Sequence, residues 1–224
     1  FFGRIKENTY KELVSLAKDA NMNIFRCWGG AGINKPAFYE ECDKNGIMVW
    51  QEFMLACNNY LGTPEYLATL ESEASYIIKN LRSHPSLAFW CGGNELFNSW
   101  SGMDDQSLPL RLLNKLCYEL DPTRPFIPTS PIMGVAHGCY LFYSPMQGGE
   151  VFAEFQNAHN TAYTEFGVPS VASLESLKQI IPEDELFPIR KTPAWVAHHA
   201  FDAWGEANWL CLDVLRSYFG EPKS

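Results

Sequence analysis

Short apolar runs alternate with longer amphipathic segments along this chain, and that alternation restricts its fold more than any other feature. The predicted strands fall within residues 23–28, 46–53, 86–95 and 126–130. The predicted helices cover residues 9–20, 36–44, 63–84 and 108–120. Strands that alternate with helices through short turns pair in parallel by means of crossover helices. The sequence therefore predicts an α/β fold, either as a doubly wound sheet or as a closed barrel.

Residue types at the helix boundaries support this order of elements, and the second helix is expected to stop at Asn45 and Gly46. A capping-box pattern opens the first helix at Thr9 and Glu12. Its expected inner face consists of Leu13, Leu16, Ala17 and Ala20. Thr63 and Pro64 open the third helix, whose expected inner face consists of Leu67, Leu70, Ala74, Ile77, Ile78 and Leu81. Two further strands are predicted within residues 137–143 and 162–167, and residues 195–219 are expected to be mainly helical.

Polar side chains stand at the ends of three predicted strands. They are Arg26 and Trp28, then Gln51 and Glu52, and then Asn94 and Glu95. In a (β/α)8 TIM barrel the apolar strand bodies fill the interior, and functional groups from several strand ends meet at one rim. The pattern therefore favours the barrel over the doubly wound sheet. Because no low-complexity linker interrupts the chain, residues 1–224 are interpreted as one domain.

Composition excludes several classes of partner. The chain has 17 Lys and Arg against 26 Asp and Glu, a formal net charge of -9, which predicts no nucleic-acid partner. No apolar run approaches the roughly 18 residues of a membrane span, so no membrane partner is expected. The first residues lack a secretory signal, but a signal can be lost by truncation, and the sequence leaves the compartment and the oligomeric state open.

Cysteines, histidines and glycines give no pattern of a metal or cofactor site. The seven cysteines form no C-x-x-C pair and are interpreted as mostly buried thiols, with Cys91 packed in a strand. The histidines are scattered and no H-E-x-x-H occurs, so no metal is expected. The glycine-rich stretch 29–32 matches no phosphate-binding pattern, so no cofactor is expected. These glycines are instead expected to let the backbone approach the pocket closely.

Two glutamates are the strongest candidates for chemistry. Glu95 and Glu165 each end a predicted strand, and a retaining glycosidase needs two carboxyl groups about 5 to 5.5 Å apart. The alternative is that each glutamate caps a helix or pairs with an arginine. An indole face suits the C–H surface of a sugar, so Trp28 is a candidate sugar contact, whereas Trp90 is assigned to packing. His137 lies where a barrel loop can aim it into the pocket, with a structural role as the alternative.

Four stretches resemble the catalytic barrel of glycoside hydrolase family two, and particularly its β-mannosidase branch. In chain order they are "NMNIFRCWGG", "FYEECDKNGIMVWQEFMLAC", "LRSHPSLAFWCGGNE" and "TEFGVPS". The resemblance implies that Glu95 is the general acid/base and Glu165 the nucleophile of a two-step, retaining hydrolysis of terminal β-mannosides. It also implies substrate-binding roles for Arg26, Trp28, Glu52, Asn94 and His137, with Glu52 standing where β-mannosidases usually have aspartate.

The chain also departs from that family. A strand before the first helix, a final tryptophan-rich strand and the preceding β-sandwich domains are missing, so we expect a partial barrel with about six of the eight strands. Its expected partners are a carbohydrate substrate and these missing parts of a longer parent chain. Two other functions stay open: a different family-two β-glycosidase (β-glucosaminidase, β-galactosidase or β-glucuronidase), or a carbohydrate-binding barrel without catalysis.

Overall fold

The computed structural model describes residues 2–144, 148–167, 172–198 and 212–221. It divides into two compact units, of which the first comprises Phe1–His137 with Asn160–Thr164. The second comprises Gly138–His159 with Glu165–Ser224. Each unit is described by itself, and the assignment of the whole chain to one domain stays a prediction.

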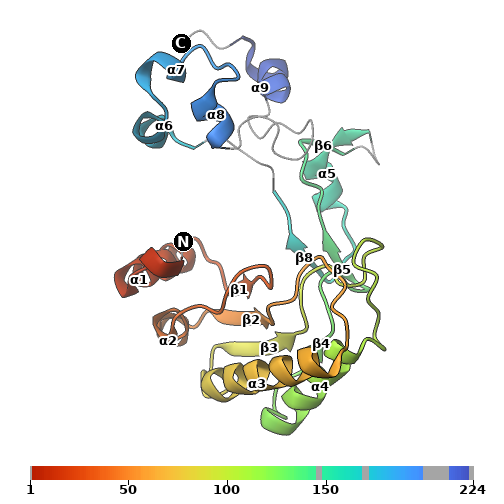
Figure 1. Cartoon of the computed structure of the whole chain (residues 1–224). Coiled ribbons are helices and arrows are strands. Elements are labelled where there is room, and N and C mark those ends of the chain that lie inside the picture. The colour runs from red at the N-terminus through yellow and green to blue at the C-terminus, as the bar shows by residue number, and fades with distance from the viewer. Residues whose placement is uncertain (1, 145–147, 168–171, 199–211, 222–224) are drawn as a thin grey trace. The chain divides into compact units, whose positions relative to one another are not determined.

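A parallel sheet forms the centre of the first unit (Figure 1). Its strands are β1 (Ile24–Cys27), β2 (Met48–Glu52), β3 (Leu87–Cys91) and β4 (Phe126–Ile127), in the order β1-β2-β3-β4. Crossovers between parallel strands are right-handed, so strands added in one direction place all of their helices on the same face. A doubly wound sheet instead reverses its strand order. The observed order is that of a barrel wall.

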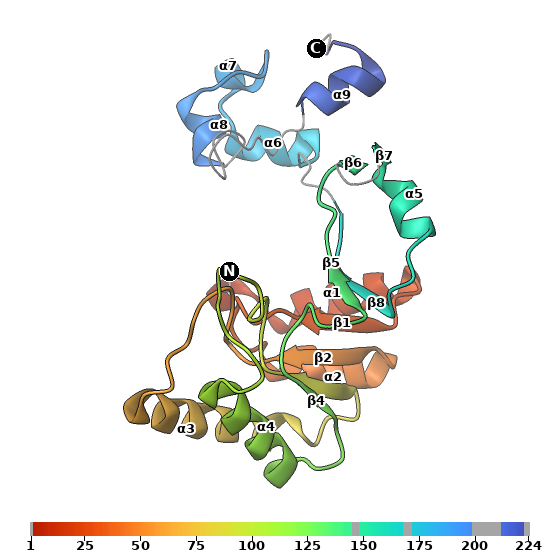
Figure 2. The ribbon, with the colours of Figure 1, turned by 90° about the vertical axis from the view of Figure 1, so that its right-hand side faces the viewer.

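Helices η1 (Phe2–Arg4), α1 (Glu7–Asp19), α2 (Pro36–Asn45), α3 (Pro64–Leu81) and α4 (Leu108–Leu120) complete this part of the unit. Helix α1 lies beside α2, and α3 lies beside α4 (Figures 1 and 2). The predicted boundary signals act as expected in two helices. The Thr63 side chain accepts a hydrogen bond from the Tyr66 N–H and caps α3, and Gly46 ends α2 in the left-handed region with φ +69°.

The two faces of the sheet carry different side chains, as the period of two in a strand requires. Val49 and Trp90 belong to the face covered by helices and are fully buried. Arg26, Trp50 and Phe89 occupy matching register positions on three neighbouring strands. The Trp50 ring lies 4.5 Å from the Phe89 ring, and the Arg26 guanidinium lies 6.0 Å from the Trp50 ring. The face opposite the helices therefore holds an aromatic layer with a cation.

The predicted start of the first helix is wrong, and its predicted inner face is correct at Ala17 but wrong at Leu13 and Leu16. Helix α1 begins at Glu7, after an extended Lys6, so Thr9 lies inside the helix instead of capping it. Its buried residues are Tyr10, Val14 and Ala17, whereas Leu13 and Leu16 are more than half exposed. Both sets of residues have helical spacing. The packing of Tyr10 against Phe38, with ring centroids 5.7 Å apart, selects the first set.

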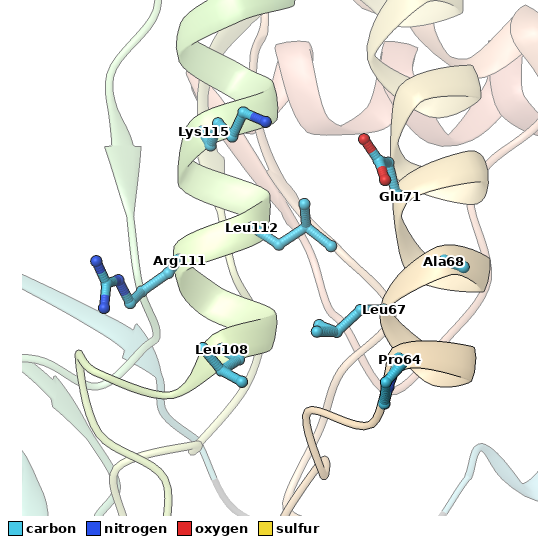
Figure 3. Close-up of a pocket in the computed structure, with 8 residues that line it drawn as sticks. All are labelled: Pro64, Leu67, Ala68, Glu71, Leu108, Arg111, Leu112 and Lys115. Carbon is cyan, nitrogen blue, oxygen red and sulfur yellow. The ribbon is translucent and has the colours of Figure 1, made fainter.

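One residue of the predicted inner face of α3 lies in a groove between α3 and α4. In Figure 3, Leu67 and Leu112 point toward each other between the two helices, and Glu71 and Lys115 stand farther along them. The groove is lined by Pro64, Leu67, Ala68, Glu71, Leu108, Arg111, Leu112 and Lys115. Leu67 is half-buried, unlike the other five predicted residues of its face, which are buried.

Strands β5 (Val135–His137) and β8 (Ala162–Glu165) pair in a separate two-stranded sheet. The strand predicted over 137–143 is therefore wrong for residues 138–142, because β5 ends at His137 and β6 (Tyr143–Ser144) begins later. Gly138, with φ +83°, lies in the left-handed region and interrupts the extended backbone at this point. The strand predicted over 162–167 is confirmed for Ala162–Glu165.

The second unit contains a short hairpin and several helices. Its elements are β6, β7 (Gly149–Glu150), α5 (Val151–Gln156), α6 (Leu174–Ile180), α7 (Glu183–Leu186), α8 (Pro193–Ala197) and α9 (Leu212–Phe219). Ile181 and Trp195 form a small core of their own. Helices α8 and α9 agree with the helical character predicted for residues 195–219, of which 199–211 lie outside the described residues. Within the described part of the chain, no helix is long and apolar enough to span a membrane.

Candidate active site

Arg26 connects the ends of several strands in the first unit. Its Nε lies 2.7 Å from Oε1 of Glu52, and its Nη2 donates a hydrogen bond to Oδ1 of Asn94. Its Nη1 donates to the backbone carbonyl of Thr164, at 3.4 Å. A guanidinium carries five donors in a rigid plane, which suits this work. Arg26 therefore fixes the relative positions of β1, β2, the segment after β3 and β8.

Glu52 is fully buried, and both of its carboxylate oxygens have partners. Oε1 binds Arg26, and Oε2 accepts the backbone N–H of Gly29 at 2.7 Å. Burial raises the pKa of Glu52, although Arg26 and Gly29 oppose that effect. A Cβ at Gly29 would lie 2.6 Å from the backbone oxygens of Phe53 and Leu55, so this glycine permits the close backbone approach expected for residues 29–32.

Asn94 is almost fully buried and is held by both ends of its amide. Its Oδ1 accepts from Arg26, and its Nδ2 donates to Sγ of Cys57 at 3.2 Å. These two bonds determine which end of the amide faces which neighbour. The amide carries a second N–H donor, which gives it a means of binding a hydroxyl group.

The backbone of Glu95 adopts an uncommon conformation, with φ +53°. Its N–H donates to the carbonyl of Ser130 at 2.7 Å, and its carbonyl accepts from the Ser101 hydroxyl at 2.7 Å. Its carboxylate Oε1 lies 3.0 Å from Nδ1 of His137, and its Oε2 accepts from the Cys57 thiol at 3.4 Å. Backbone and side chain are thus both held, which maintains a conformation that a glutamate rarely adopts.

A chain of hydrogen bonds continues from His137 into the protein. Nε2 of His137 lies 2.9 Å from the Ser130 hydroxyl, which lies 2.7 Å from the Thr164 hydroxyl. Ser130 follows β4 and forms a parallel bridge with Asn94, so it belongs to the same row of strand ends. His137 itself ends β5, and only 6% of its side chain is exposed. This chain fixes the imidazole against Glu95.

Glu165 is the last residue of β8 and follows Thr164 directly. Within the second unit, its Oε2 accepts a hydrogen bond of 2.7 Å from the Tyr140 hydroxyl, and its backbone carbonyl accepts the N–H of Gly138 at 3.0 Å. A hydroxyl that donates to a carboxylate stabilises the ionised form. An ionised carboxylate is the form that attacks as a nucleophile.

The tryptophans and Cys91 lie in the predicted kinds of surroundings. Trp28 lies in the turn after β1 and is 46% exposed, and its role as a sugar contact stays a prediction. Trp90 is fully buried, and its Nε1 donates to Asp121 at 2.9 Å, which confirms its assignment to packing. Cys91 is fully buried, and burial raises the pKa of its thiol, which agrees with its assignment to packing.

The structure brings five predicted site residues together in the first unit, namely Arg26, Glu52, Asn94, Glu95 and His137. In the same unit it adds Cys57, Ser130 and Thr164, which the sequence interpretation missed, and within the second unit it adds Tyr140 beside Glu165. The sequence could have indicated Ser130, because it is a polar residue at the end of the predicted strand 126–130, as Glu52 is near the end of the predicted strand 46–53. Cys57 and Tyr140 lie in loops, where no spacing indicates which site a side chain joins.

Comparisons with known proteins find relatives of this chain. The family model "Glycosyl hydrolases family 2, TIM barrel domain" matches residues 3–173. Beta-mannosidase B of Thermothelomyces thermophilus is 29% identical over 211 residues, which are 81% of this chain and 24% of that protein. Beta-mannosidase of Mus musculus is 30% identical over 214 residues, covering 83% of this chain and 24% of that protein. The chain thus spans about a quarter of the length of these relatives.

Solved structures show the same fold. The beta-D-mannosidase of Dictyoglomus thermophilum matches with a TM-score of 0.69 and 33% identity, over 81% of this chain and 24% of that chain. A beta-glucuronidase of Parabacteroides merdae matches with a TM-score of 0.54 and 19% identity, over 75% of this chain and 22% of that chain. These matches, together with the family model, confirm the predicted TIM barrel, of which this chain covers a part.

Proposed function

This chain belongs to the family 2 glycosyl hydrolases, as part of their TIM barrel domain, and we propose that it forms the catalytic site of a retaining exo-β-mannosidase. The proposed substrate is a terminal β-mannoside, and the proposed reaction is a double displacement. The β-mannosidase names of the relatives support the choice of sugar.

In the first step, Glu165 attacks the anomeric carbon while Glu95 donates a proton to the departing glycosidic oxygen. The bond from the anomeric carbon to that oxygen breaks as the bond to the Glu165 carboxylate forms. The Tyr140 hydroxyl donates a hydrogen bond to the attacking carboxylate, which supports its orientation toward the anomeric carbon. Asn94 offers its remaining N–H to the sugar 2-hydroxyl, a contact that strengthens in the transition state.

In the second step, the carboxylate of Glu95 removes a proton from water, and the oxygen of that water attacks the anomeric carbon. The bond to Glu165 breaks, and the product leaves with its original configuration. Glu95 regains its proton, ready for the next substrate. His137 and Cys57 each contact one oxygen of this carboxyl group, which supports a role that needs a fixed direction for proton transfer.

One observation carries this proposal: Glu95 stands in a network that orients its carboxyl group and holds its backbone at φ +53°. A glutamate that merely caps a helix or pairs with an arginine needs neither feature. The Arg26 guanidinium is instead bound to Glu52 and Asn94. Strained backbone of this kind persists where the surrounding structure enforces it, which occurs often at active sites.

The proposal is tested with the full-length natural protein and an aryl β-mannoside. Proton NMR of the first-formed sugar is expected to show retention. Glu95→Gln and Glu165→Gln are each expected to lose about 100-fold or more of the turnover. Glu41→Gln is the matched control, because Glu41 is bound to Lys44 on α2 and belongs to no part of the site. Full turnover by either site variant would contradict the assignment.

A panel of aryl β-glycosides separates the alternatives. Greater turnover of a glucosaminide, galactoside or glucuronide than of the mannoside would assign another family-two activity. Sugar binding in calorimetry, with no turnover of any glycoside, would instead indicate a binding barrel without catalysis.

A further inference from the structure

Cys57 lies in the loop after β2, and backbone hydrogen bonds join this loop to the segment that carries Asn94 and Glu95. Its backbone N–H donates to the Asn94 carbonyl at 2.9 Å, and the Asn94 N–H donates to the Leu55 carbonyl at 2.9 Å. Ala56 and Asn94 form a parallel bridge between these bonds. Cys57 holds a left-handed backbone conformation, with φ +50°. The loop is therefore fixed beside the proposed acid/base by its main chain.

The thiol of Cys57 joins the side chains of the same two residues. Sγ accepts a hydrogen bond from Nδ2 of Asn94 at 3.2 Å and donates one to Oε2 of Glu95 at 3.4 Å. A thiol is both a weak acceptor and a weak donor, so one sulfur atom can serve both neighbours. The sulfur stands between the amide and the carboxyl group.

Each of these two side chains is held from two sides, and Cys57 supplies one side for both. The Asn94 amide lies between Arg26 and Cys57. The Glu95 carboxyl group lies between His137 and Cys57. Without the thiol, and counting only side-chain bonds among the described residues, the Asn94 amide keeps its bond to Arg26 and the Glu95 carboxyl group keeps its bond to His137. Rotation of either group then becomes easier, and the direction of proton transfer is less well defined.

We propose that Cys57 is a positioning residue for proton transfer by Glu95, acting through its thiol on Glu95 and Asn94 together. This inference rests on the proposed glycosidase function. If Cys57 positions the acid, its contribution to the rate depends on how strongly the leaving group needs a proton. A good leaving group departs with little help from an acid, whereas a poor leaving group requires a proton delivered at the right moment.

The test compares two substrates in the full-length protein, a 2,4-dinitrophenyl β-mannoside and a β-linked mannose disaccharide. In Cys57→Ala, kcat/KM for the disaccharide is expected to fall about tenfold. This is less than the roughly 100-fold or greater effect of losing a general acid, because Glu95 is still present but is less well oriented. The value for the dinitrophenyl glycoside is expected to change less than threefold. Cys57→Ser keeps a donor and an acceptor at this position and is expected to recover part of the loss.

Ser101→Ala is the matched control, because the Ser101 hydroxyl binds the backbone carbonyl of Glu95 and leaves its carboxyl group untouched. Its two kcat/KM values are expected to change by the same factor. Equal losses on both substrates in Cys57→Ala, or no loss on either, would overturn the proposal and leave Cys57 a structural loop residue. Circular dichroism and urea unfolding of Cys57→Ala report any misfolding, and Cys57→Ser then provides the same comparison in a folded variant.

The two proposals fail in different ways. If the wild-type protein turns over no β-glycoside, or if Glu95→Gln is fully active, the proposed function is wrong. If the wild-type protein is active and Glu95→Gln is not, but Cys57→Ala shows no difference between the two substrates, only the role of Cys57 is wrong.

Discussion

Arg26 and Glu52 form an ion pair between neighbouring strands, with Nε and Oε1 2.7 Å apart and with 12% and 0% of their side chains exposed. The pair lies at the strand ends, and Arg26 also reaches Asn94 and the carbonyl of Thr164. A buried ion pair is weak evidence for stability but is well suited to fixing geometry. We interpret Glu52 as the residue that orients Arg26, because both of its oxygens already have protein partners.

Glu52→Gln is expected to destabilise the protein by about 3 kcal/mol, because it leaves the buried Arg26 charge without its counter-ion. Activity is expected to fall as well, since Asn94 loses a fixed neighbour. Urea unfolding and kcat/KM for an aryl β-mannoside measure the two effects. Glu52→Asp keeps the charge and is expected to lose less of both. Unchanged stability in Glu52→Gln would contradict this interpretation of the pair.

Ser130→Ala removes the hydroxyl that joins His137 to Thr164. Two part-buried polar groups, Nε2 of His137 and the Thr164 hydroxyl, lose a partner, so a loss of about 1 kcal/mol in unfolding free energy is expected. Turnover is expected to fall because His137 is held less firmly against Glu95. Ser107→Ala is the control, since its hydroxyl contacts only the exposed Asp104 among the described side chains. If both variants behave alike, the hydroxyl chain does not support the site.

Tyr140→Phe removes the hydrogen bond to the Glu165 carboxylate. Such a bond to a charged group contributes about 1.5–3 kcal/mol, which corresponds to roughly a 10- to 100-fold fall in kcat/KM. Steady-state kinetics with an aryl β-mannoside measure this fall. Tyr118→Phe is the control, because Tyr118 lies on α4 and is 77% exposed. A rate equal to that of the wild type would show that Tyr140 does not support the nucleophile.

Asp43→Asn tests a contact between α2 and the start of β3. Burial acts to raise the pKa of Asp43, but hydrogen bonds from Ser86 and His84 outweigh burial and lower it. A carboxyl group with a lowered pKa contributes stability above its unfolded value of about 3.9, and that stability is lost as the pH falls through the folded value. Asp43→Asn is therefore expected to be less stable than the wild type at pH 7.

The difference is expected to shrink as the pH falls below about 4, first because Asp43 becomes protonated in the unfolded chain and then because it becomes protonated in the folded protein at lower pH. Urea unfolding of both proteins between pH 7 and pH 3 measures this convergence. A constant difference over the whole range would show that the charge of Asp43 makes no contribution.

Local patterns were enough to predict most of the barrel wall. The apolar runs correctly placed β1 to β4, because a buried parallel strand needs apolar side chains on both faces. Thr63 and Gly46 marked helix boundaries, because a side-chain cap and a left-handed residue act on their own backbone. The polar strand ends indicated Arg26, Glu52 and Asn94, because parallel strands bring their carboxyl ends to one edge.

The missed features depend on contacts between distant parts of the chain. The face of α1 is set by packing against Phe38, and helical spacing alone cannot decide between Tyr10 and Leu13. Cys57 joins the site through a loop, and Ser130 through a hydroxyl chain that ends on another sheet. Nothing in the local sequence around Cys57 indicates its contacts, and the position of Ser130 at a strand end does not indicate its partners. The role of Glu52 also required the structure, because a strand-end carboxylate can face a substrate or an arginine equally well.

The central claim is that Glu165 forms a covalent bond to the sugar, and trapping of that intermediate tests it most directly. The full-length protein is incubated with 2-deoxy-2-fluoro-β-mannosyl fluoride, digested and mapped by mass spectrometry. The account predicts one added fluoromannosyl group, on the peptide that contains Glu165, and no label in Glu165→Gln. A label on another residue, or rapid hydrolysis with inversion and no trapped species, would contradict it.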